Sequence, residues 1–309
     1  MKISIVVPVY NEEQNINPFY EKVVSSLKNS VAKDYELIFV DDGSKDNSFN
    51  LLAKLVSKDK RVRVVKLRKN FGQTAAMNAG FQETKNPIIV TLDADLQNDP
   101  SDIPLLLSKL NEGYDVVSGW RWQRKDPLSK KLFSKMAFFL RRSMTKDKIH
   151  DSGCTLKAYK ADALKGLNLY GEAHRFIPTL LAWKGYKVGE VKVSHHQRKF
   201  GKTKYSSSRI FRGFLDLLTL KFWQDYSTRP LHFFARIGII NLILGIIIVL
   251  YNLGRYGLDF NNIGPTLLAA ALFILIGVQF FGLGFIAEIQ IRIYYSQNKN
   301  YEVEKVLKK

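Results

Sequence analysis

The sequence predicts an α/β domain with a mostly parallel central sheet, followed by an interfacial amphipathic helix and a two-helix transmembrane hairpin. Three observations lead to this prediction. Over residues 1–120, short apolar β-branched runs alternate with segments of helical length, as in open α/β sheets. A stretch with apolar residues at helical spacing begins near residue 206, and two long uncharged stretches come after it.

Five runs in the first 120 residues have the apolar composition of strands that are buried on both faces of a sheet. The expected strands are Ile3–Val7, Glu36–Val40, Arg63–Leu67, Ile88–Leu92 and Val116–Ser118. The expected helices between them are Ile16–Leu27, Ser48–Ser57, Gln73–Phe81 and Ser101–Asn111. Because open α/β sheets bind ligands beyond the carboxyl ends of their strands, the polar residues that follow these runs form the candidate site. Those clusters are Tyr10-Asn11-Glu12, Asp41-Asp42-Gly43-Ser44, Asn70-Phe71-Gly72-Gln73 and Asp93-Ala94-Asp95.

The C-terminal third is predicted to associate with a membrane. Residues 206–226 have apolar side chains at helical spacing with charged residues opposite, which indicates an interfacial helix, and Pro230 marks the turn into the first span. Ile237–Gly254 and Phe260–Ala287 are uncharged and reach the ~18–20 residues that cross a bilayer; a buried hairpin of a soluble protein is the alternative. The expected domains are residues 1–205 (the α/β domain), 206–230 (juxtamembrane), 231–290 (two transmembrane helices) and 291–309 (a basic tail).

Basic residues indicate how the hairpin is oriented. Arg229 and Arg236 precede the first span, Arg292 and Lys299 follow the second, and the connection between them has one arginine, Arg255. The positive-inside rule then places both termini and the α/β domain in the cytoplasm. The first residues show no signal-peptide cleavage pattern, so we expect an integral protein of the cytoplasmic (inner) membrane.

The charge of the chain is concentrated in its middle third. The 309 residues include 47 Lys and Arg against 28 Asp and Glu, a formal net charge of +19, to which residues 1–100 contribute +1 and residues 101–204 contribute +13. From Arg121 to Lys148, basic residues alternate with apolar ones at helical spacing. This pattern indicates either a helix on anionic lipid headgroups or a solvated surface helix. No nucleic-acid-binding pattern accompanies it, so nucleic acid is not expected as a partner. The single cysteine, Cys154, excludes a disulfide framework.

The strongest chemical signal is Asp93-Ala94-Asp95-Leu96-Gln97, at the end of an apolar strand. Two carboxylates two residues apart can reach one hard cation, and Gln97 can add a carbonyl oxygen, so Mg²⁺ or Mn²⁺ shared with substrate phosphates is expected. An ordinary turn is the alternative, which the other clusters at strand ends disfavour. No G-x-G-x-x-G motif follows a strand, and the Gly201-Lys202-Thr203 stretch lacks the earlier glycine of a P-loop.

Four motifs in order resemble the family-2 inverting glycosyltransferases with the GT-A fold. They are Pro8-Val9-Tyr10-Asn11-Glu12, Val40-Asp41-Asp42-Gly43-Ser44-Lys45-Asp46, Asn70-Phe71-Gly72 and Asp93-Ala94-Asp95-Leu96-Gln97. The stretches His150-Asp151-Ser152-Gly153-Cys154 and Arg198–Tyr205, with the two C-terminal spans, resemble the dolichyl-phosphate mannose synthase branch in its bacterial polyprenyl-phosphate form. The resemblance covers essentially the whole chain.

The resemblance implies a role for each motif. The nucleotide-sugar donor would be bound by Pro8, Tyr10, Asn11, Glu12, Asp41, Asp42, Gly72, Gln73, Asp93 and Ala94. Glu12 would accept from ribose hydroxyls and Asp42 from a base N–H. Asp93, Asp95 and Gln97 would hold the metal against the diphosphate. Structural roles are the alternatives for Pro8 as a strand end, for the Asp41-Asp42 pair as a helix cap, and for Gly72 as a turn residue.

The implied acceptor is polyprenyl phosphate, either undecaprenyl or dolichyl. A phosphate monoester, with a second pKa of ~6, is already ionised near neutral pH and needs cations rather than a strong base. The acceptor-phosphate candidates are Arg121, Ser152, Arg198, Lys202 and Lys204, and the catalytic candidates are Asp95, Asp151 and Arg198. Asp151 is the available base, but the position of Cys154 is acidic in some close relatives. Asp151 therefore acts either as a base or by orienting Arg198 or a loop.

The expected function is transfer of one hexose from a UDP- or GDP-linked sugar to polyprenyl phosphate at the cytoplasmic membrane face, for cell-envelope glycans. One alternative is a glycosyltransferase for another lipid or a polysaccharide, which the absence of a Gln-x-x-Arg-Trp motif and of further spans disfavours. The other is a non-catalytic scaffold that binds nucleotide-sugars. The sugar, the nucleotide and the oligomeric state stay open, and a homo-oligomer is compatible with the sequence.

Overall fold

The computed structural model describes residues 1–28, 30–32, 34–122, 149–167, 169, 171–197, 215, 218, 219, 221–257 and 260–297. The chain divides into two compact units, Met1–Leu217 and Leu218–Lys309. Most of the predicted basic helix, and the predicted site residues Arg198, Lys202 and Lys204, lie outside the described residues.

The first unit contains a seven-stranded sheet with the strand order β3-β2-β1-β4-β6-β5-β7. Its strands are β1 (Lys2–Val9), β2 (Asp34–Asp41), β3 (Val62–Lys66), β4 (Ile88–Thr91), β5 (Val116–Arg121), β6 (Lys157–Lys160) and β7 (Val188–Val193). The neighbours β1–β2, β1–β4, β2–β3 and β5–β7 are parallel, whereas β6 runs antiparallel to both β4 and β5. The five strands expected from sequence are confirmed, and the mostly parallel sheet with them.

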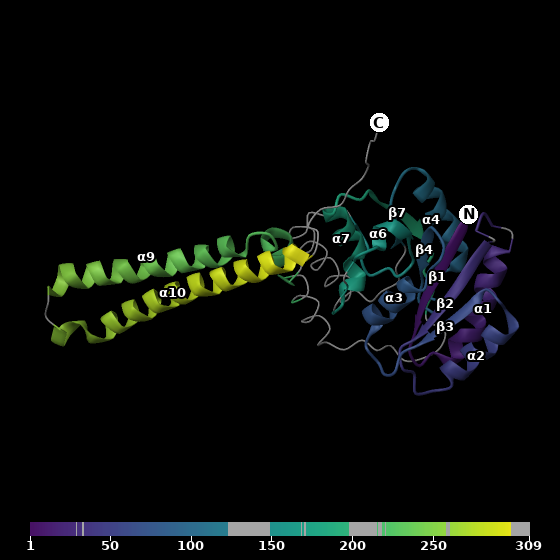
Figure 1. Ribbon diagram of the computed structural model, residues 1–309, viewed down its shortest axis with the longest axis horizontal. Helices are drawn as coiled ribbons and strands as arrows, with labels where there is room; N and C mark the ends of the chain where they lie inside the picture. The colour runs from purple at the N-terminus through teal and green to yellow at the C-terminus, as the bar shows by residue number, and fades with distance from the viewer. Residues whose placement is uncertain are drawn as a thin grey trace. The chain divides into compact units, whose positions relative to one another are not determined.

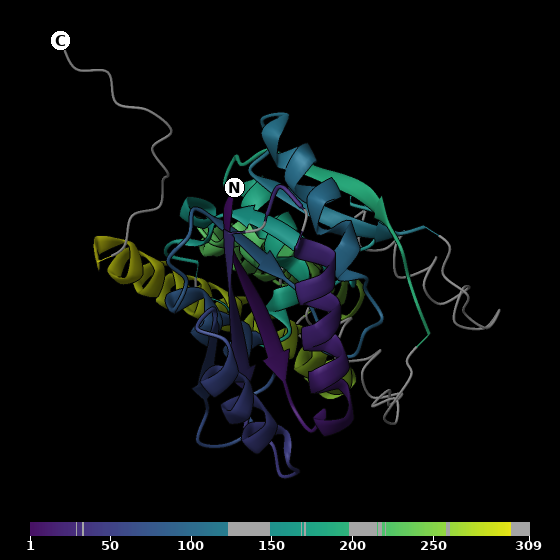
Figure 2. The same cartoon turned by 90° about the vertical axis from the view of Figure 1, so that its right-hand side faces the viewer.

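Helices cover both faces of this sheet (Figures 1 and 2). They are α1 (Glu13–Leu27), α2 (Ser48–Lys58), α3 (Gln73–Gln82), α4 (Ile103–Asn111), α6 (Ala161–Leu164) and α7 (Ile177–Trp183), with 3₁₀ turns η1 (Pro100–Asp102) and η2 (Ala173–Phe176). Because successive strand residues point to opposite faces, Ile5 packs in the core formed with α1, α2 and α4, while Val6 packs in the core formed with α3 and α7. The expected helix Ser101–Asn111 is split, because its first turn is the 3₁₀ turn η1, which is capped by the Asp99 side chain.

The register of the strands brings the polar clusters to one edge of the sheet. Val9 at the end of β1 pairs with Asp41 at the end of β2, so the residues that follow both strands lie level. The reversed direction of β6 has a further effect. Its first residue, Lys157, pairs with Thr91 of β4 and with Ser118 of β5. The chain that enters β6 therefore approaches the same edge as the chain that leaves β4 and β5.

The second unit consists mainly of two long helices that lie side by side, α9 (Pro230–Tyr256) and α10 (Phe260–Gln297) (Figure 1). Both are long and apolar enough to cross a bilayer, and only 11% and 17% of their most apolar windows are buried, unlike the core helices of a soluble domain. Small residues allow a close approach: a Cβ on Gly277 would lie 2.9 Å from the carbonyl oxygen of Gly238. The prediction of two helices that could form a hairpin, with Pro230 at the start of the first, is confirmed.

Candidate active site

The loops that follow β1 and β2 are joined by hydrogen bonds between their backbones and side chains. The Asn11 N–H donates to Ser44 Oγ at 2.9 Å, and Asn11 Oδ1 accepts from the Lys45 N–H at 2.8 Å. The Glu12 N–H donates to Ser48 Oγ at 2.9 Å. Asn11 has a φ of 53°, a left-handed conformation that asparagine tolerates better than most residues. The motifs that sequence separates by some 30 residues therefore form one rigid rim.

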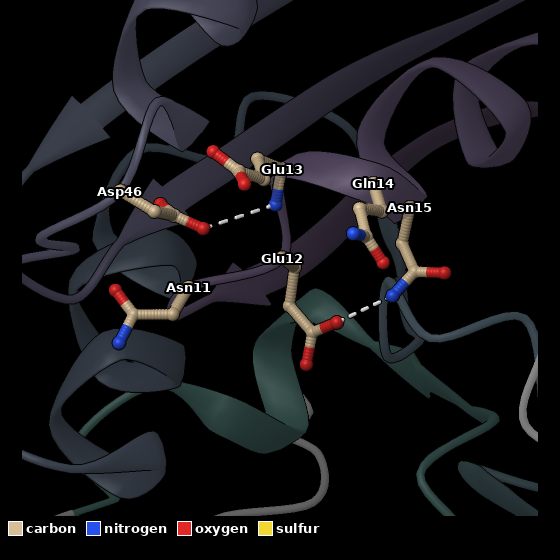
Figure 3. A pocket seen from close by; sticks show the side chains of 6 residues that line it. All are labelled: Asn11, Glu12, Glu13, Gln14, Asn15 and Asp46. Atoms are coloured by element: carbon tan, nitrogen blue, oxygen red, sulfur yellow. Dashed lines mark hydrogen bonds between the residues drawn. The ribbon is translucent and has the colours of Figure 1, made fainter. Parts of the chain in front are cut away.

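A pocket of about 200 Å³ opens at this rim (Figure 3). It is lined by Asn11, Glu12, Glu13, Gln14, Asn15 and Asp46. Asp46 accepts from the Glu13 N–H at 3.2 Å, and the carboxylate of Glu12 accepts from the Asn15 amide. Burial raises the pKa of Asp46, but hydrogen bonds from Ser48 and Glu13 outweigh it and hold the pKa below its usual value. The pocket is therefore rich in carboxylate and amide oxygens, which suit the hydroxyl and N–H donors of a nucleoside.

Asp41 and Asp42, at the end of β2, have different surroundings. Asp41 is fully buried; its Oδ1 accepts from the Ser44 N–H, and its Oδ2 has no hydrogen-bond partner within the described part of the chain. Asp42 accepts from the N–H groups of Phe71 and Gly72 at 2.7 and 2.9 Å, and also from the Asn70 amide. Burial raises the pKa of Asp42. Asp42 thus holds the loop between β3 and α3, which is a role that its motif did not predict.

Two glycines allow this loop to approach. A Cβ on Gly43 would lie 2.4 Å from the carbonyl carbon of Lys69, so only glycine permits the contact. Gly72 has open space around its Cβ position but a φ of 93°, so its conformation rather than crowding requires glycine. This conformation fits the alternative role of Gly72 as a turn residue, and its role in donor binding stays a prediction. Pro8, Tyr10 and Ala94 lie at the same edge, at the ends of β1 and β4.

The carboxylate motif follows β4. Asp93 Oδ1 accepts from the side-chain amide of Gln73 at 2.8 Å, and Asp95 Oδ1 accepts from the Gln97 N–H at 3.1 Å. Burial, and next the charge of Asp95, raise the pKa of Asp93. The two carboxylates therefore repel each other at a half-buried site.

This donor set fits a divalent cation. Within the described residues, no three His, Cys, Asp or Glu side chains gather as a complete cluster of metal ligands. Asp93 and Asp95 supply two hard oxygen ligands, and a bound cation would relieve the repulsion between them. Mg²⁺ is commonly held by one or two carboxylates together with substrate phosphates and water, so two carboxylates are sufficient.

Arg121, at the end of β5, and Asp151, before β6, lie at the same edge of the sheet. Arg121 Nε and Nη2 donate to the two oxygens of Asp151 at 2.6 and 2.8 Å, and both side chains are mostly buried. Beside this pair, the Trp120 ring stacks on His150 with 4.3 Å between centroids. Glu190 accepts from the His150 N–H at 2.8 Å. These contacts therefore hold the end of β5 against the residues that precede β6. In the structure Asp151 pairs with Arg121, while Arg198, which the sequence analysis considers as a residue that Asp151 orients, lies outside the described residues.

Sequence reasoning missed several residues at this edge of the sheet. Lys157 is buried and donates to the carbonyl oxygen of Ser152 at 3.2 Å. Burial lowers the pKa of Lys157 to about 8. Thr155 accepts from the Asn98 amide at 2.9 Å, and its carbonyl accepts from Thr91 Oγ1. The only available signal for Lys157 was a lysine inside an otherwise apolar run, and that run had not been assigned as a strand.

Known proteins have sequences similar to this chain. Residues 4–167 match the model of the family described as "Glycosyl transferase family 2". Dodecaprenyl-phosphate galacturonate synthase of Rhizobium johnstonii is 41% identical over 99% of this chain and 93% of that protein. Undecaprenyl-phosphate 4-deoxy-4-formamido-L-arabinose transferase of Pectobacterium atrosepticum is 37% identical over 94% of this chain and 89% of that protein. Both relatives are named as transferases or synthases of sugar-linked polyprenyl phosphates.

Solved structures agree on the fold. Glucosyl-3-phosphoglycerate synthase from Mycobacterium tuberculosis, in complex with Mn²⁺, UDP and glucosyl-3-phosphoglycerate, superposes with a TM-score of 0.56 over 71% of this chain and 79% of that chain, at 20% identity. Its complex with Mg²⁺ and UDP gives a TM-score of 0.53 over 70% of this chain and 79% of that one, at 18% identity. The expected GT-A fold and the expected glycosyltransferase activity are both confirmed. The chain belongs to glycosyl transferase family 2.

Proposed function

We propose that this protein is a membrane-bound inverting glycosyltransferase that moves one sugar, a hexose, from a UDP- or GDP-linked donor to polyprenyl phosphate at the cytoplasmic face. The observation that carries the proposal is that the candidate metal ligands and the candidate phosphate-binding arginine lie at the same edge of the sheet. The carboxylates of Asp93 and Asp95 follow β4 and the guanidinium of Arg121 ends β5, with only β6 between these strands. A carboxylate pair suits a metal-bound diphosphate, and an arginine suits the phosphate of an acceptor.

The donor half would bind the nucleotide at the joined loops after β1 and β2. Glu12 would accept from ribose hydroxyls. Because Asp42 accepts from the N–H groups of Phe71 and Gly72, Asp41 would take its place as the acceptor for a base N–H, since its Oδ2 has no hydrogen-bond partner among the described residues. Asp93, Asp95 and Gln97 would hold Mg²⁺ or Mn²⁺, which supplies positive charge to the departing diphosphate. The structures of M. tuberculosis glucosyl-3-phosphoglycerate synthase, which contain UDP with Mn²⁺ or Mg²⁺, support this choice of ions.

The acceptor half would hold the lipid phosphate next to Arg121, with Ser152 and, from sequence, Arg198, Lys202 and Lys204 as further donors. A phosphate oxygen attacks the anomeric carbon from the face opposite the diphosphate. The bond from the anomeric carbon to the diphosphate oxygen breaks, and its electron pair leaves with the nucleoside diphosphate. Because the attacking phosphate is already ionised, no proton needs to be removed from it. The names of both relatives support polyprenyl phosphate as the acceptor class.

The hairpin of α9 and α10 would anchor the protein in the cytoplasmic membrane. Arg229 and Arg236 flank its start and Arg292 follows its apolar part, which supports a cytoplasmic location for both termini. A C-terminal green fluorescent protein fusion should fluoresce, and a C-terminal alkaline phosphatase fusion should be inactive. The opposite pattern would reverse the proposed orientation.

The proposed reaction is tested with the full-length protein in liposomes that contain undecaprenyl phosphate and Mg²⁺ or Mn²⁺. Donors are supplied one at a time: UDP-glucose, UDP-galactose, UDP-N-acetylhexosamine, GDP-mannose, and the nucleotide-linked forms of galacturonate and 4-deoxy-4-formamido-L-arabinose. Mass spectrometry of the lipid fraction should show one sugar on undecaprenyl phosphate with one of these donors. Asp95→Ala should abolish the product, whereas Asp162→Ala, an 86% exposed carboxylate on α6, should not. Sugar on long polymer but never on polyprenyl phosphate would favour the polysaccharide alternative.

A further inference from the structure

Lys157, the first residue of β6, is an unusual group in this domain. Its side chain is 3% exposed, and the neighbours Leu156, Ala158 and Tyr159 are fully buried. The ammonium donates to the Ser152 carbonyl oxygen at 3.2 Å but forms no ion pair with any described residue. Burying an ammonium without a directly bonded carboxylate is costly, so its retention calls for a compensating interaction.

The position of Lys157 supplies that interaction. In the register of the sheet, Lys157 lies level with Thr91, two residues before Asp93, and with Ser118, three residues before Arg121. The negative charges of Asp151 and Asp93 favour the charged form of Lys157, while the positive charge of Arg121 opposes it. Lys157 therefore lies on the strand between β4, which leads to the proposed metal-binding carboxylates, and β5, which ends in Arg121.

Several hydrogen bonds restrain the turn that Lys157 contacts. The Asp151 carboxylate is held by Arg121, the Asp151 N–H donates to Glu190 at 3.3 Å, and the Asp151 carbonyl accepts from the Cys154 N–H at 3.3 Å. Lys157 adds the bond to the Ser152 carbonyl. A Cβ on Gly153 would lie 3.2 Å from Arg121 Nη2, so the turn packs directly on this guanidinium. A shift of the turn would therefore move Arg121 as well.

We propose that Lys157 is a positioning residue for the acceptor phosphate. By holding the Ser152 carbonyl, it fixes the Asp151–Gly153 turn against Arg121, and its charge offsets that of the phosphate that Arg121 binds. The inference rests on the proposed function, because it assigns Lys157 to the acceptor half of that site. A buried positive charge acts over several ångströms where water is excluded, so Lys157 need not touch the phosphate.

The test measures binding of farnesyl phosphate, a short polyprenyl phosphate, to the detergent-solubilised full-length protein by calorimetry. Farnesol, which has the same tail without the phosphate, is the ligand control. Lys157→Met removes the charge and the donor at similar length, Lys157→Arg keeps both, and Lys157→Gln keeps only a donor. Lys160→Met is the matched control, because Lys160 lies on the same strand but is 47% exposed and pairs with Asp115 at the other end.

Lys157→Met should weaken farnesyl phosphate binding about tenfold, the loss expected for a hydrogen bond to a charged group, without weakening the binding of UDP and Mn²⁺. Lys157→Arg should restore most of the affinity, and Lys160→Met should match the wild type. Equal binding by the wild type and by a folded Lys157→Met would overturn the proposal, as would an equal loss of UDP binding. If Lys157→Met does not fold, Lys157→Gln decides by the same criterion. A wild type that binds farnesol and farnesyl phosphate equally would instead refute the proposed acceptor.

Discussion

Arg121 and Asp151 form a bidentate ion pair, although they lie 30 positions apart in the chain. Both carboxylate oxygens of Asp151 accept from the guanidinium, and Oδ2 also accepts from the Arg121 backbone N–H at 3.3 Å. An arginine held in this way keeps a fixed orientation, which suits the binding of a phosphate. The pair therefore favours an orienting role for Asp151 over the role of a general base.

The first prediction separates these two roles. Asp151→Asn should raise the KM for undecaprenyl phosphate about tenfold and change kcat less, because the neutral amide holds Arg121 more weakly. The pH dependence of kcat should keep its shape. A loss of kcat of about a thousandfold at unchanged KM would instead identify Asp151 as a base. Arg121→Lys keeps the positive charge but loses the paired N–H donors of the guanidinium, so it should also raise the KM for undecaprenyl phosphate.

The second prediction concerns the contact of Gly43 with the loop before α3. Gly43→Ala should displace Lys69 and Asn70 and raise the KM for the nucleotide-sugar at least about tenfold, since misplaced binding groups lose affinity and rate together. Gly113→Ala is the matched control. Both glycines have positive φ values, 68° and 96°, so both variants should lose about 1–2 kcal/mol of stability, but nothing lies near the Cβ position of Gly113. A Gly113→Ala variant with the same donor KM as Gly43→Ala would refute the crowding argument.

The third prediction concerns pH-dependent stability away from the site. Hydrogen bonds from Arg61 lower the pKa of Asp59 to about 2, and Asp59 also accepts from the Tyr20 hydroxyl at 2.9 Å. A lowered pKa stabilises the folded state above the unfolded value of ~3.9, and this contribution is lost as the pH falls towards 2. Because Arg61 is 43% exposed, Asp59→Asn should cost only about 1 kcal/mol at pH 7.

Unfolding of that variant is measured by denaturant titration in detergent at several pH values. The difference from the wild type should shrink between about pH 4 and pH 2, as Asp59 becomes protonated. Asp162→Asn, on an 86% exposed side chain, should match the wild type throughout. A deficit for Asp59→Asn that is the same at pH 7 and pH 2 would show that packing, not charge, is responsible.

The fourth prediction concerns the hairpin. A side chain at Gly277 would meet Leu242 Cγ at 2.7 Å and the Gly238 carbonyl oxygen, whereas nothing lies near the Cβ position of Gly282. Gly277→Leu should therefore force α9 and α10 apart, and Gly282→Leu should not. Cysteine pairs placed across the two helices should lose oxidative cross-linking only in the first variant. Equal cross-linking in both variants would show that the close approach is absent in the membrane.

The sequence predicted the five parallel strands well because their signal is local. Runs such as Ile3–Val7 and Glu36–Val40 are nearly all apolar, and a strand buried on both faces favours that composition. The polar clusters at their ends could be assigned to one site because parallel strands share a carboxyl edge. Asp93 and Asp95 were recognisable for the same reason, since their spacing and strand-end location are both visible in the chain.

Contacts between distant segments could not be predicted in this way. The partner of Asp42 is the loop around Phe71, and the partner of Asp151 is Arg121; neither follows from spacing. Lys157 was overlooked because a lysine usually lies at the surface, and only the position of β6 between two other strands shows that it is buried. The roles of these residues depend on contacts between segments that are far apart in the chain, and the residues around each of them do not show which segment it will contact.

The reversed strand β6 also determines where the chain leaves and re-enters the sheet. Since β5 and β6 are antiparallel neighbours, the chain leaves the sheet at Trp122 and re-enters at Ile149 from the same side, closed at its base by the stacked rings of Trp120 and His150. The cost of closing such a connection grows only slowly with its length. A longer or shorter stretch between Trp122 and Ile149 would therefore cost the sheet little stability.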